Sequence, residues 1–193
     1  KILPAAIKPN SAFFEQYGFP WMRALRAVIR DAKKLKVPVI LDVKRGDIGK
    51  TSFAYARACF GVWNADAVTL NPYMGREVLD PFVHYLQQEK GAYLLCRTSN
   101  PSAAVIQDVF VDGTVKKKFY EHVTEKILGW HVPGVGVVVG ATVPEALHTI
   151  LMLLSRSGKE VPLLIPGIGT QGGSLSSVLK ALKESGTDLR LHR

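Results

Sequence analysis

The charged residues with the most informative spacing lie in one short segment, Asp42-Val43-Lys44-Arg45-Gly46-Asp47, at the end of an apolar stretch. In a β-strand Asp42 and Lys44 face the same side, because successive side chains alternate between the two faces. Alternating carboxylates and ammonium groups keep one another ionised in a poorly solvated place, and fixed cations can stabilise negative charge that develops in a reaction. We therefore interpret the segment as a candidate catalytic array. The alternative is a surface salt-bridge cluster that opens a helix.

A second lysine has an equivalent position. Lys8 ends the apolar residues 4–7 and is followed by Pro9 and Asn10. A lone lysine in such a place is usually a surface residue that extends its charged end into water. If the two strand ends are adjacent, however, Lys8 lies beside Asp42 and Lys44, and two lysines and two aspartates form one array.

A glycine-rich segment, Pro166-Gly167-Ile168-Gly169-Thr170-Gln171-Gly172-Gly173, is a candidate anion site. It lies between an apolar stretch and a helical pattern that begins at Ser174. Exposed backbone N–H groups at the start of a helix bind anions, and glycines allow a close approach of the backbone. A phosphate site and a simple tight turn between a strand and a helix are both compatible with this segment.

Short apolar stretches alternate with longer amphipathic ones along the whole sequence, which is the pattern of repeated βα units. Strands are expected at residues 4–8, 37–43, 67–70, 92–96, 135–139 and 161–165. Helices are expected at residues 19–34, 51–62, 76–88, 115–130, 143–155 and 174–185. The longest expected loop, residues 98–113, follows the fourth strand and is a candidate lid.

Two architectures fit this pattern, a doubly wound open sheet and a (β/α)8 TIM barrel. Polar residues at the C-terminal ends of successive expected strands favour the barrel, because a closed barrel gathers these ends around one mouth. They are Lys8, Asp42, Lys44, Asn71, Thr98, Ser99, Thr142 and Gly167. Six strands are two fewer than the barrel needs. We therefore expect residues 1–193 to form a single α/β barrel domain that is incomplete at both ends, with the first and last strands missing.

The composition is typical of a globular protein, with 47% hydrophobic and 21% charged residues. The net charge of +9 attracts anions, but no segment interleaves aromatic and basic residues, and we expect no nucleic acid partner. No apolar run has the ~20 residues of a membrane helix, so we expect no membrane association. Cys59 and Cys96 indicate buried free thiols in a cytoplasmic protein. The five histidines lack metal-ligand spacing, and we expect neither a metal nor an organic cofactor.

Together these segments resemble the orotidine 5′-phosphate decarboxylase family. Asp42-x-Lys44-x-x-Asp47, followed by Ile48 and Thr51, is similar to the family's signature. Five further segments resemble one branch of the family, in the same order along the chain. They are Lys8-Pro9-Asn10-Ser11-Ala12-Phe13-Phe14-Glu15, Asn71-Pro72-Tyr73-Met74-Gly75, Arg97-Thr98-Ser99-Asn100-Pro101, Val139-Gly140-Ala141-Thr142 and residues 165–173. Each segment is weak alone, but together they cover nearly the whole chain.

The resemblance implies a reaction and a role for each charged residue. The reaction is decarboxylation of orotidine 5′-monophosphate (OMP) to UMP in pyrimidine biosynthesis, with no cofactor. Lys44 would deliver a proton to C6 of the pyrimidine as carbon dioxide leaves, Asp42 would face the departing carboxylate, and Lys8 would hold the array and the ribose hydroxyls. Asp47 would complete the array from the second subunit of a homodimer with shared active sites.

The resemblance also implies positions that bind the substrate. Thr51 would reach a ribose hydroxyl across the dimer, Ser99 would hydrogen-bond the amide edge of the pyrimidine with Thr98 beside it, and Gln171 would contact the phosphate. The full set of implied substrate-binding residues is Thr51, Ile48, Thr98, Ser99, Gly167, Gln171 and Gly172.

Two pieces of the family pattern are absent from the sequence. They are the aspartate that ends the family's first strand and the arginine that follows its last strand; the final residues 189–193 do not match. Two other functions stay open. One is a related barrel with the same D-x-K-x-x-D strand end that acts with magnesium on a sugar-phosphate keto acid. The other is a barrel without activity that serves as a scaffold.

Overall fold

The computed structural model describes residues 2–111, 113 and 116–186. Val115, where one helix is expected to begin, and the unmatched residues 189–193 lie outside this part of the chain. The chain divides into two compact units, Lys1–Tyr93 and Leu94–Arg193. In the described residues no helix is both long enough and apolar enough to cross a membrane.

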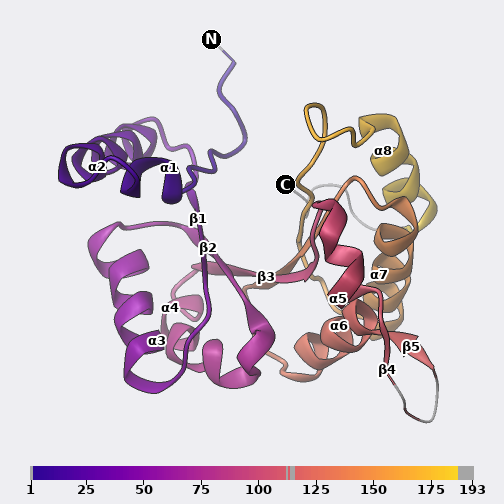
Figure 1. The fold of residues 1–193 in the computed structure, drawn as a ribbon. Helices are drawn as coiled ribbons and strands as arrows, with labels where there is room; N and C mark the ends of the chain where they lie inside the picture. The colour runs from indigo at the N-terminus through magenta and orange to yellow at the C-terminus, as the bar shows by residue number, and fades with distance from the viewer. Residues whose placement is uncertain (1, 112, 114–115, 187–193) are drawn as a thin grey trace. The chain divides into compact units, whose positions relative to one another are not determined.

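The first unit is built around two parallel strands, β1 (Ile40–Arg45) and β2 (Ala67–Leu70), and the start of β3 (Gly91–Arg97) (Figure 1). Ile40 pairs with Ala67, and Leu41 pairs with Val68. The other elements of this unit are α1 (Ala12–Glu15), α2 (Phe19–Lys34), α3 (Gly49–Ala56), the π-helix η1 (Arg57–Val62), the 3₁₀ turns η2 (Pro72–Met74), η3 (Arg76–Val78) and η4 (Asp80–Phe82), and α4 (Val83–Leu86).

Buried apolar side chains explain these elements. Helix α2 buries Leu25, Ile29 and Ala32, whose spacing places them on one helical face, and the rest of the helix is largely exposed. All four residues of β2 are buried, as expected for a strand of a parallel sheet covered on both faces. The continuous apolar runs therefore form the sheet, and the amphipathic stretches form the helices beside it.

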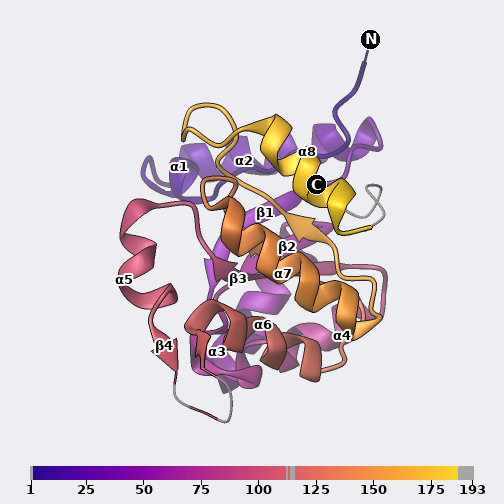
Figure 2. The same cartoon turned by 90° about the vertical axis from the view of Figure 1, so that its right-hand side faces the viewer.

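The second unit contains the rest of β3 together with β6 (Val135–Val139) and β7 (Leu163–Leu164), and β6 and β7 pair in parallel. Helix α7 (Pro144–Ser157) contacts both α6 (Phe119–Gly129) and α8 (Leu175–Glu184) (Figure 2). After β3 the chain forms the 3₁₀ turn η5 (Pro101–Ala103), helix α5 (Ala104–Gln107) and an antiparallel pair, β4 (Phe110–Val111) and β5 (Lys117–Lys118).

Several expected elements are confirmed at their expected bounds: α2, β2 and β6. The expected strand at residues 4–8 is reduced to one isolated parallel bridge, from Ile7 to Val39, and a second bridge joins Asn10 to Asp42. The expected strand at residues 161–165 is reduced to β7. The expected loop at residues 98–113 contains η5, α5 and β4.

One expected helix, residues 76–88, is wrong. The segment consists of η3, η4 and only one turn of α-helix, α4. Pro81 lies within η4, where its missing N–H and its ring prevent a continuous α-helix. Apolar spacing alone predicted a helix here, but the proline divides it into short turns.

Candidate active site

Lys8, Asp42 and Lys44 form one charged cluster in the first unit. Lys8 Nζ lies 2.7 Å from Asp42 Oδ2, and Lys44 Nζ lies 2.6 Å from Asp42 Oδ1. Asp42 is 6% exposed, whereas the side chains of Lys8 and Lys44 are 33% and 49% exposed. A buried carboxylate therefore holds one ammonium group on each oxygen, and both ammonium groups extend toward solvent.

The backbone around Lys8 explains why it reaches Asp42. The Asp42 N–H donates to the Pro9 carbonyl over 3.0 Å, and the Ser11 N–H donates to the Asp42 carbonyl over 3.2 Å. Residues 9–11 therefore run along β1, and Lys8 stands beside the strand end. The expectation that these two segments are neighbours agrees with these hydrogen bonds.

The electrostatics of the cluster keep Asp42 ionised. Burial by itself would raise the pKa of Asp42, but the hydrogen bonds and positive charges of Lys44 and Lys8 outweigh burial, and the pKa lies below its ordinary value. The ionised Asp42 carboxylate thus lies between two lysine ammonium groups. Such a fixed excess of positive charge can stabilise an anionic intermediate.

Lys44 has an unusual backbone conformation. Its φ is 43°, in the left-handed region that residues other than glycine adopt rarely. The pairing register of β1 with β2 shifts between Leu41 and Arg45, so Lys44 lies in an irregular part of the strand. Unfavourable backbone geometry of this kind is often found at functional sites.

Asp47, Ile48 and Thr51 do not join this cluster. Asp47 forms no ion pair with any described residue, and its Oδ1 accepts the Ile48 N–H over 2.8 Å. Ile48 is 46% exposed and Thr51, in the first turn of α3, is also exposed. These three residues lie just beyond the cluster along the chain, with side chains available to another molecule.

A second group of polar residues lies in the second unit and centres on Ser99. The Ser99 hydroxyl donates to Gln171 Oε1 over 2.8 Å, and the Ser99 carbonyl accepts from Thr142 Oγ1 over 2.8 Å. The Thr98 N–H donates to Gln107 Oε1 over 2.8 Å. Residues that follow β3, β6 and β7 are thus joined by hydrogen bonds, as expected for the C-terminal ends of neighbouring parallel strands.

The glycine-rich segment forms a tight loop that leads to α8. Gly167 and Gly172 have positive φ values of 99° and 88°. The N–H groups of Gly172 and Gly173 donate to the carbonyls of Gly169 and Gly167 over 2.7 and 2.9 Å. These two N–H groups are consequently engaged within the loop, so an anion would have to be bound by other donors, among which the Gln171 side chain is exposed.

The backbone of Gly140 packs closely against Ser99. A Cβ atom there would lie 2.6 Å from Ser99 Cα and 2.8 Å from Ser99 N. We expect Gly140→Ala to displace Ser99 and to lower the free energy of unfolding by about 1–3 kcal/mol, the usual cost of overpacking. Urea denaturation measures this change in the free energy of unfolding. Gly129→Ala is the control, because Gly129 lies in α6 with nothing within 4 Å of its Cβ position; equal stability of the two variants would contradict this packing.

Thr69 was not predicted as a site residue, although it contacts the charged cluster directly. It is 2% exposed in β2, and its hydroxyl donates to Asp42 Oδ1 over 2.9 Å. A single hydroxyl within an otherwise apolar strand, Ala67–Leu70, is the signal by which the sequence could have indicated it.

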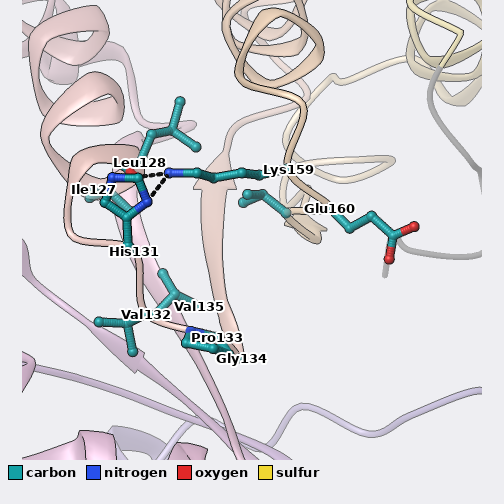
Figure 3. A pocket seen from close by; sticks show the side chains of 10 residues that line it. Ile127, Leu128, His131, Val132, Pro133, Gly134, Val135, Lys159 and Glu160 are labelled. Atoms are coloured by element: carbon teal, nitrogen blue, oxygen red, sulfur yellow. Dashed lines mark hydrogen bonds between the residues drawn. The ribbon is translucent and has the colours of Figure 1, made fainter.

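A separate pocket of about 240 Å³ lies in the second unit between the end of α6, the start of β6 and the residues that precede β7 (Figure 3). Lys159 points across it, and its Nζ lies 2.5 Å from the Leu128 carbonyl and 2.7 Å from His131 Nδ1. The pocket opens at the N-terminal ends of β6 and β7, whereas Ser99 and Gln171 follow C-terminal strand ends. It is therefore not part of the candidate site.

The described residues contain no group of three or more His, Cys, Asp or Glu side chains placed to hold a metal. Cys59 and Cys96 are free and buried, as expected. Burial raises their thiol pKa values to about 11 and about 12, so both stay protonated at neutral pH.

Comparison with known proteins gives consistent matches. The model of the orotidine 5′-phosphate decarboxylase / HUMPS family matches residues 3–188. A Roseiflexus sp. (strain RS-1) protein named orotidine 5′-phosphate decarboxylase is 44% identical over 182 residues, which are 93% of this chain and 63% of that protein. The solved structure of Leishmania donovani OMP decarboxylase has a TM-score of 0.78 at 42% identity, over 91% of this chain and 66% of that one.

A larger protein gives a similar match. The structure of Leishmania donovani UMP synthase has a TM-score of 0.80 at 43% identity and is covered to 38% of its length. These likenesses confirm the α/β barrel class expected from the sequence. The chain spans 63% of the Roseiflexus protein and 66% of the Leishmania decarboxylase.

Proposed function

The chain belongs to the orotidine 5′-phosphate decarboxylase / HUMPS family, and we propose that the protein decarboxylates OMP to UMP in pyrimidine biosynthesis. The observation that carries this proposal is the cluster in which Asp42 is buried between Lys8 and Lys44. Decarboxylation leaves negative charge at a carbon atom, and the two lysines of this cluster supply fixed cations that can stabilise that charge. The reaction then requires no electron-accepting cofactor.

In the proposed mechanism Lys44 is the proton donor. The bond between C6 and the carboxyl carbon breaks, the electron pair remains at C6, and carbon dioxide leaves. The Lys44 ammonium group then gives a proton to C6, becomes a neutral amine and recovers its proton from water. Asp42 faces the departing carboxylate and holds the ammonium group of Lys44 in place, while Lys8 holds Asp42 and contacts the ribose hydroxyls.

We assign the binding of the rest of OMP to the second group of polar residues. Ser99, with Thr98 beside it, binds the amide edge of the pyrimidine. Gln171 binds the phosphate through its side chain, and Gly167 and Gly172, with their positive φ values, shape the loop that brings the phosphate close. The hydrogen bond between Ser99 and Gln171 supports this assignment, because it couples the segment proposed for the base to the segment proposed for the phosphate. Binding energy from the phosphate can then orient the reacting carbon.

We also propose that the protein is a homodimer in which Asp47, Ile48 and Thr51 reach the active site of the partner subunit, and that residues 1–193 belong to a single barrel domain. Its location is the cytoplasm, with no nucleic acid or membrane partner. The exposure of Ile48 and Thr51 and the absence of an ion pair of Asp47 within the described residues support the shared site.

The activity is tested by incubating the purified protein with OMP and following the loss of its ultraviolet absorbance, with UMP identified as the product. Turnover to UMP is the expected result. A protein that binds UMP but does not consume OMP would favour the scaffold role, and a protein that does neither would contradict the proposal.

A chelator distinguishes this reaction from that of a magnesium-dependent barrel. We expect full activity in excess EDTA, because both oxygens of Asp42 already accept hydrogen bonds from lysine ammonium groups and positive charge is supplied by Lys8 and Lys44. The measurement compares OMP turnover with and without EDTA. Loss of turnover that added Mg²⁺ restores would favour the lyase that acts on a sugar-phosphate keto acid.

A further inference from the structure

The hydroxyl of Thr69 makes three hydrogen bonds at the centre of the charged cluster. It accepts the Val43 N–H over 3.1 Å and the Lys44 N–H over 2.9 Å, and it donates to Asp42 Oδ1 over 2.9 Å. Thr69 is 2% exposed, so water does not compete for this hydroxyl. One side chain therefore connects the backbone of Lys44 to the carboxylate that holds its ammonium group.

The directions of these bonds follow from the chemistry of a hydroxyl, which has one hydrogen and two lone pairs. Both lone pairs receive backbone N–H groups, so the hydrogen must point to Asp42. Asp42 Oδ1 must then accept, which the ionised carboxylate does. The same oxygen also accepts from Lys44 Nζ, and Oδ2 accepts from Lys8 Nζ. Thr69 consequently fixes the rotation of the carboxylate about its side-chain bond.

The backbone contacts have a second consequence. Lys44 has a φ of 43°, and the register of β1 against β2 shifts between Leu41 and Arg45. A residue other than glycine keeps this conformation only when its surroundings hold it. The two N–H groups that Thr69 accepts belong to this irregular part of the strand, so the hydroxyl supports the conformation from which the Lys44 side chain leaves the backbone.

We propose that Thr69 is a positioning residue of the active site, which holds the Asp42 carboxylate and the left-handed backbone of Lys44 in the geometry needed for proton delivery. This inference rests on the proposed decarboxylation. It assigns a role to a residue that contacts Asp42 and the Lys44 backbone, and it predicts an effect on the chemical step rather than on substrate binding.

Thr69→Val tests the role, because valine has nearly the same shape and no hydroxyl. We expect kcat for OMP to fall about 10- to 100-fold, the range for loss of a hydrogen bond to a charged group, with KM changed less than about 3-fold. Thr69→Ser restores the hydroxyl and should return kcat to within about 3-fold of the wild type. A purely structural threonine would not separate kcat from KM in this way.

Thr124→Val is the matched control. Thr124 is also fully buried, and its hydroxyl donates to the Tyr120 carbonyl over 2.8 Å within α6. The Thr124→Val variant shows the effect on kcat of losing a buried hydroxyl that does not contact Asp42 or Lys44. We expect its kcat to equal that of the wild type. Circular dichroism and urea denaturation of all variants establish which proteins are folded.

Three outcomes overturn the role of Thr69: wild-type kcat in folded Thr69→Val, an equal loss of kcat in Thr124→Val, or a serine variant as impaired as the valine variant. If Thr69→Val does not fold, Thr69→Cys replaces it, since a thiol is a weak donor and acceptor of similar size; a cysteine variant with wild-type kcat would also overturn it. A wild-type protein that does not convert OMP contradicts the proposed function itself, before any variant is compared.

Discussion

Lys44→Ala is expected to lower kcat for OMP decarboxylation by at least ~10²–10⁴, the contribution of general acid catalysis alone. The physical reason is that the substitution removes both the proposed proton donor and one of the two ammonium groups that flank Asp42. UMP should still bind measurably, because Ser99 and Gln171, the residues proposed to bind the base and the phosphate, are unchanged. Steady-state kinetics and calorimetric titration with UMP measure the two effects separately.

Lys36→Ala is the control for this substitution. Lys36 is an exposed lysine that follows α2, and its φ of 56° places it in the same left-handed region as Lys44. The two alanine variants therefore carry the same change in charge and a similar backbone cost, but only one of them touches the cluster. Near-normal turnover by Lys44→Ala would show that the proton comes from another group, and an equal loss in Lys36→Ala would show that the effect is not specific to the cluster.

The elements that the sequence predicted best are those with a single local cause. Strands β2 and β6 are short apolar runs, and α2 is an amphipathic stretch with buried Leu25, Ile29 and Ala32 on one face. In each case the period of the apolar residues and the observed element agree. Residues 76–88 have a similar apolar pattern, but Pro81 breaks the helix, and a stricter use of the proline signal would have predicted this.

The charged cluster could be anticipated because its residues end two expected strands, and the segment around Lys8 does run parallel to β1 through isolated bridges. Lys8 and Asp42 are 34 positions apart, and the expectation that they lie side by side depended on adjacent strand ends, as in a barrel. The hydrogen bond from Ser99 to Gln171 spans 72 positions, and its partners could be named as neighbours only through the family resemblance. The spacing of residues in a sequence predicts which of them lie at a strand end, but it does not predict which atoms there form hydrogen bonds.

Thr69 shows what the sequence could not predict. Its hydroxyl serves the cluster because the register shifts within β1 and Lys44 adopts a positive φ. Both features are irregularities of the strand, and neither has a signal in apolar periodicity, which describes regular strands. Thr69 is recognisable in the sequence as the one hydroxyl of an apolar strand, but its contact with Asp42 follows only from the pairing of β1 with β2.

We expect each active site to be shared between two subunits. Asp47 is two positions beyond Arg45, the last residue of β1, yet it forms no ion pair with a described residue. Four apolar residues at or near this part of the chain are also exposed: Ile48 just before α3, Phe53 in α3, and Tyr73 and Met74 in η2 are 46%, 60%, 79% and 54% exposed. We expect a partner subunit to cover these residues, and a two-fold interface requires each subunit to give and receive the same residues.

Lys44→Ala and Asp47→Ala should each be nearly inactive alone, because every site of either homodimer lacks one group. Mixed and allowed to exchange subunits, they form heterodimers in which one site carries both lesions and the other carries neither. Random exchange makes half of the dimers mixed, with one intact site of two, so about a quarter of wild-type activity should return. Exchange is followed by native mass spectrometry, and activity is measured by OMP turnover.

A mixture of Lys44→Ala with Lys8→Ala provides the control, because both residues bind Asp42 of their own chain. In those heterodimers each site still lacks one lysine, so no activity should return even though subunits exchange to the same extent. Recovery in the first mixture and not in the second can arise only if Asp47 acts in the partner's site. If exchange is complete and neither mixture recovers, Asp47 serves its own subunit, and its side chain must turn from the Ile48 N–H toward Lys44 when OMP binds.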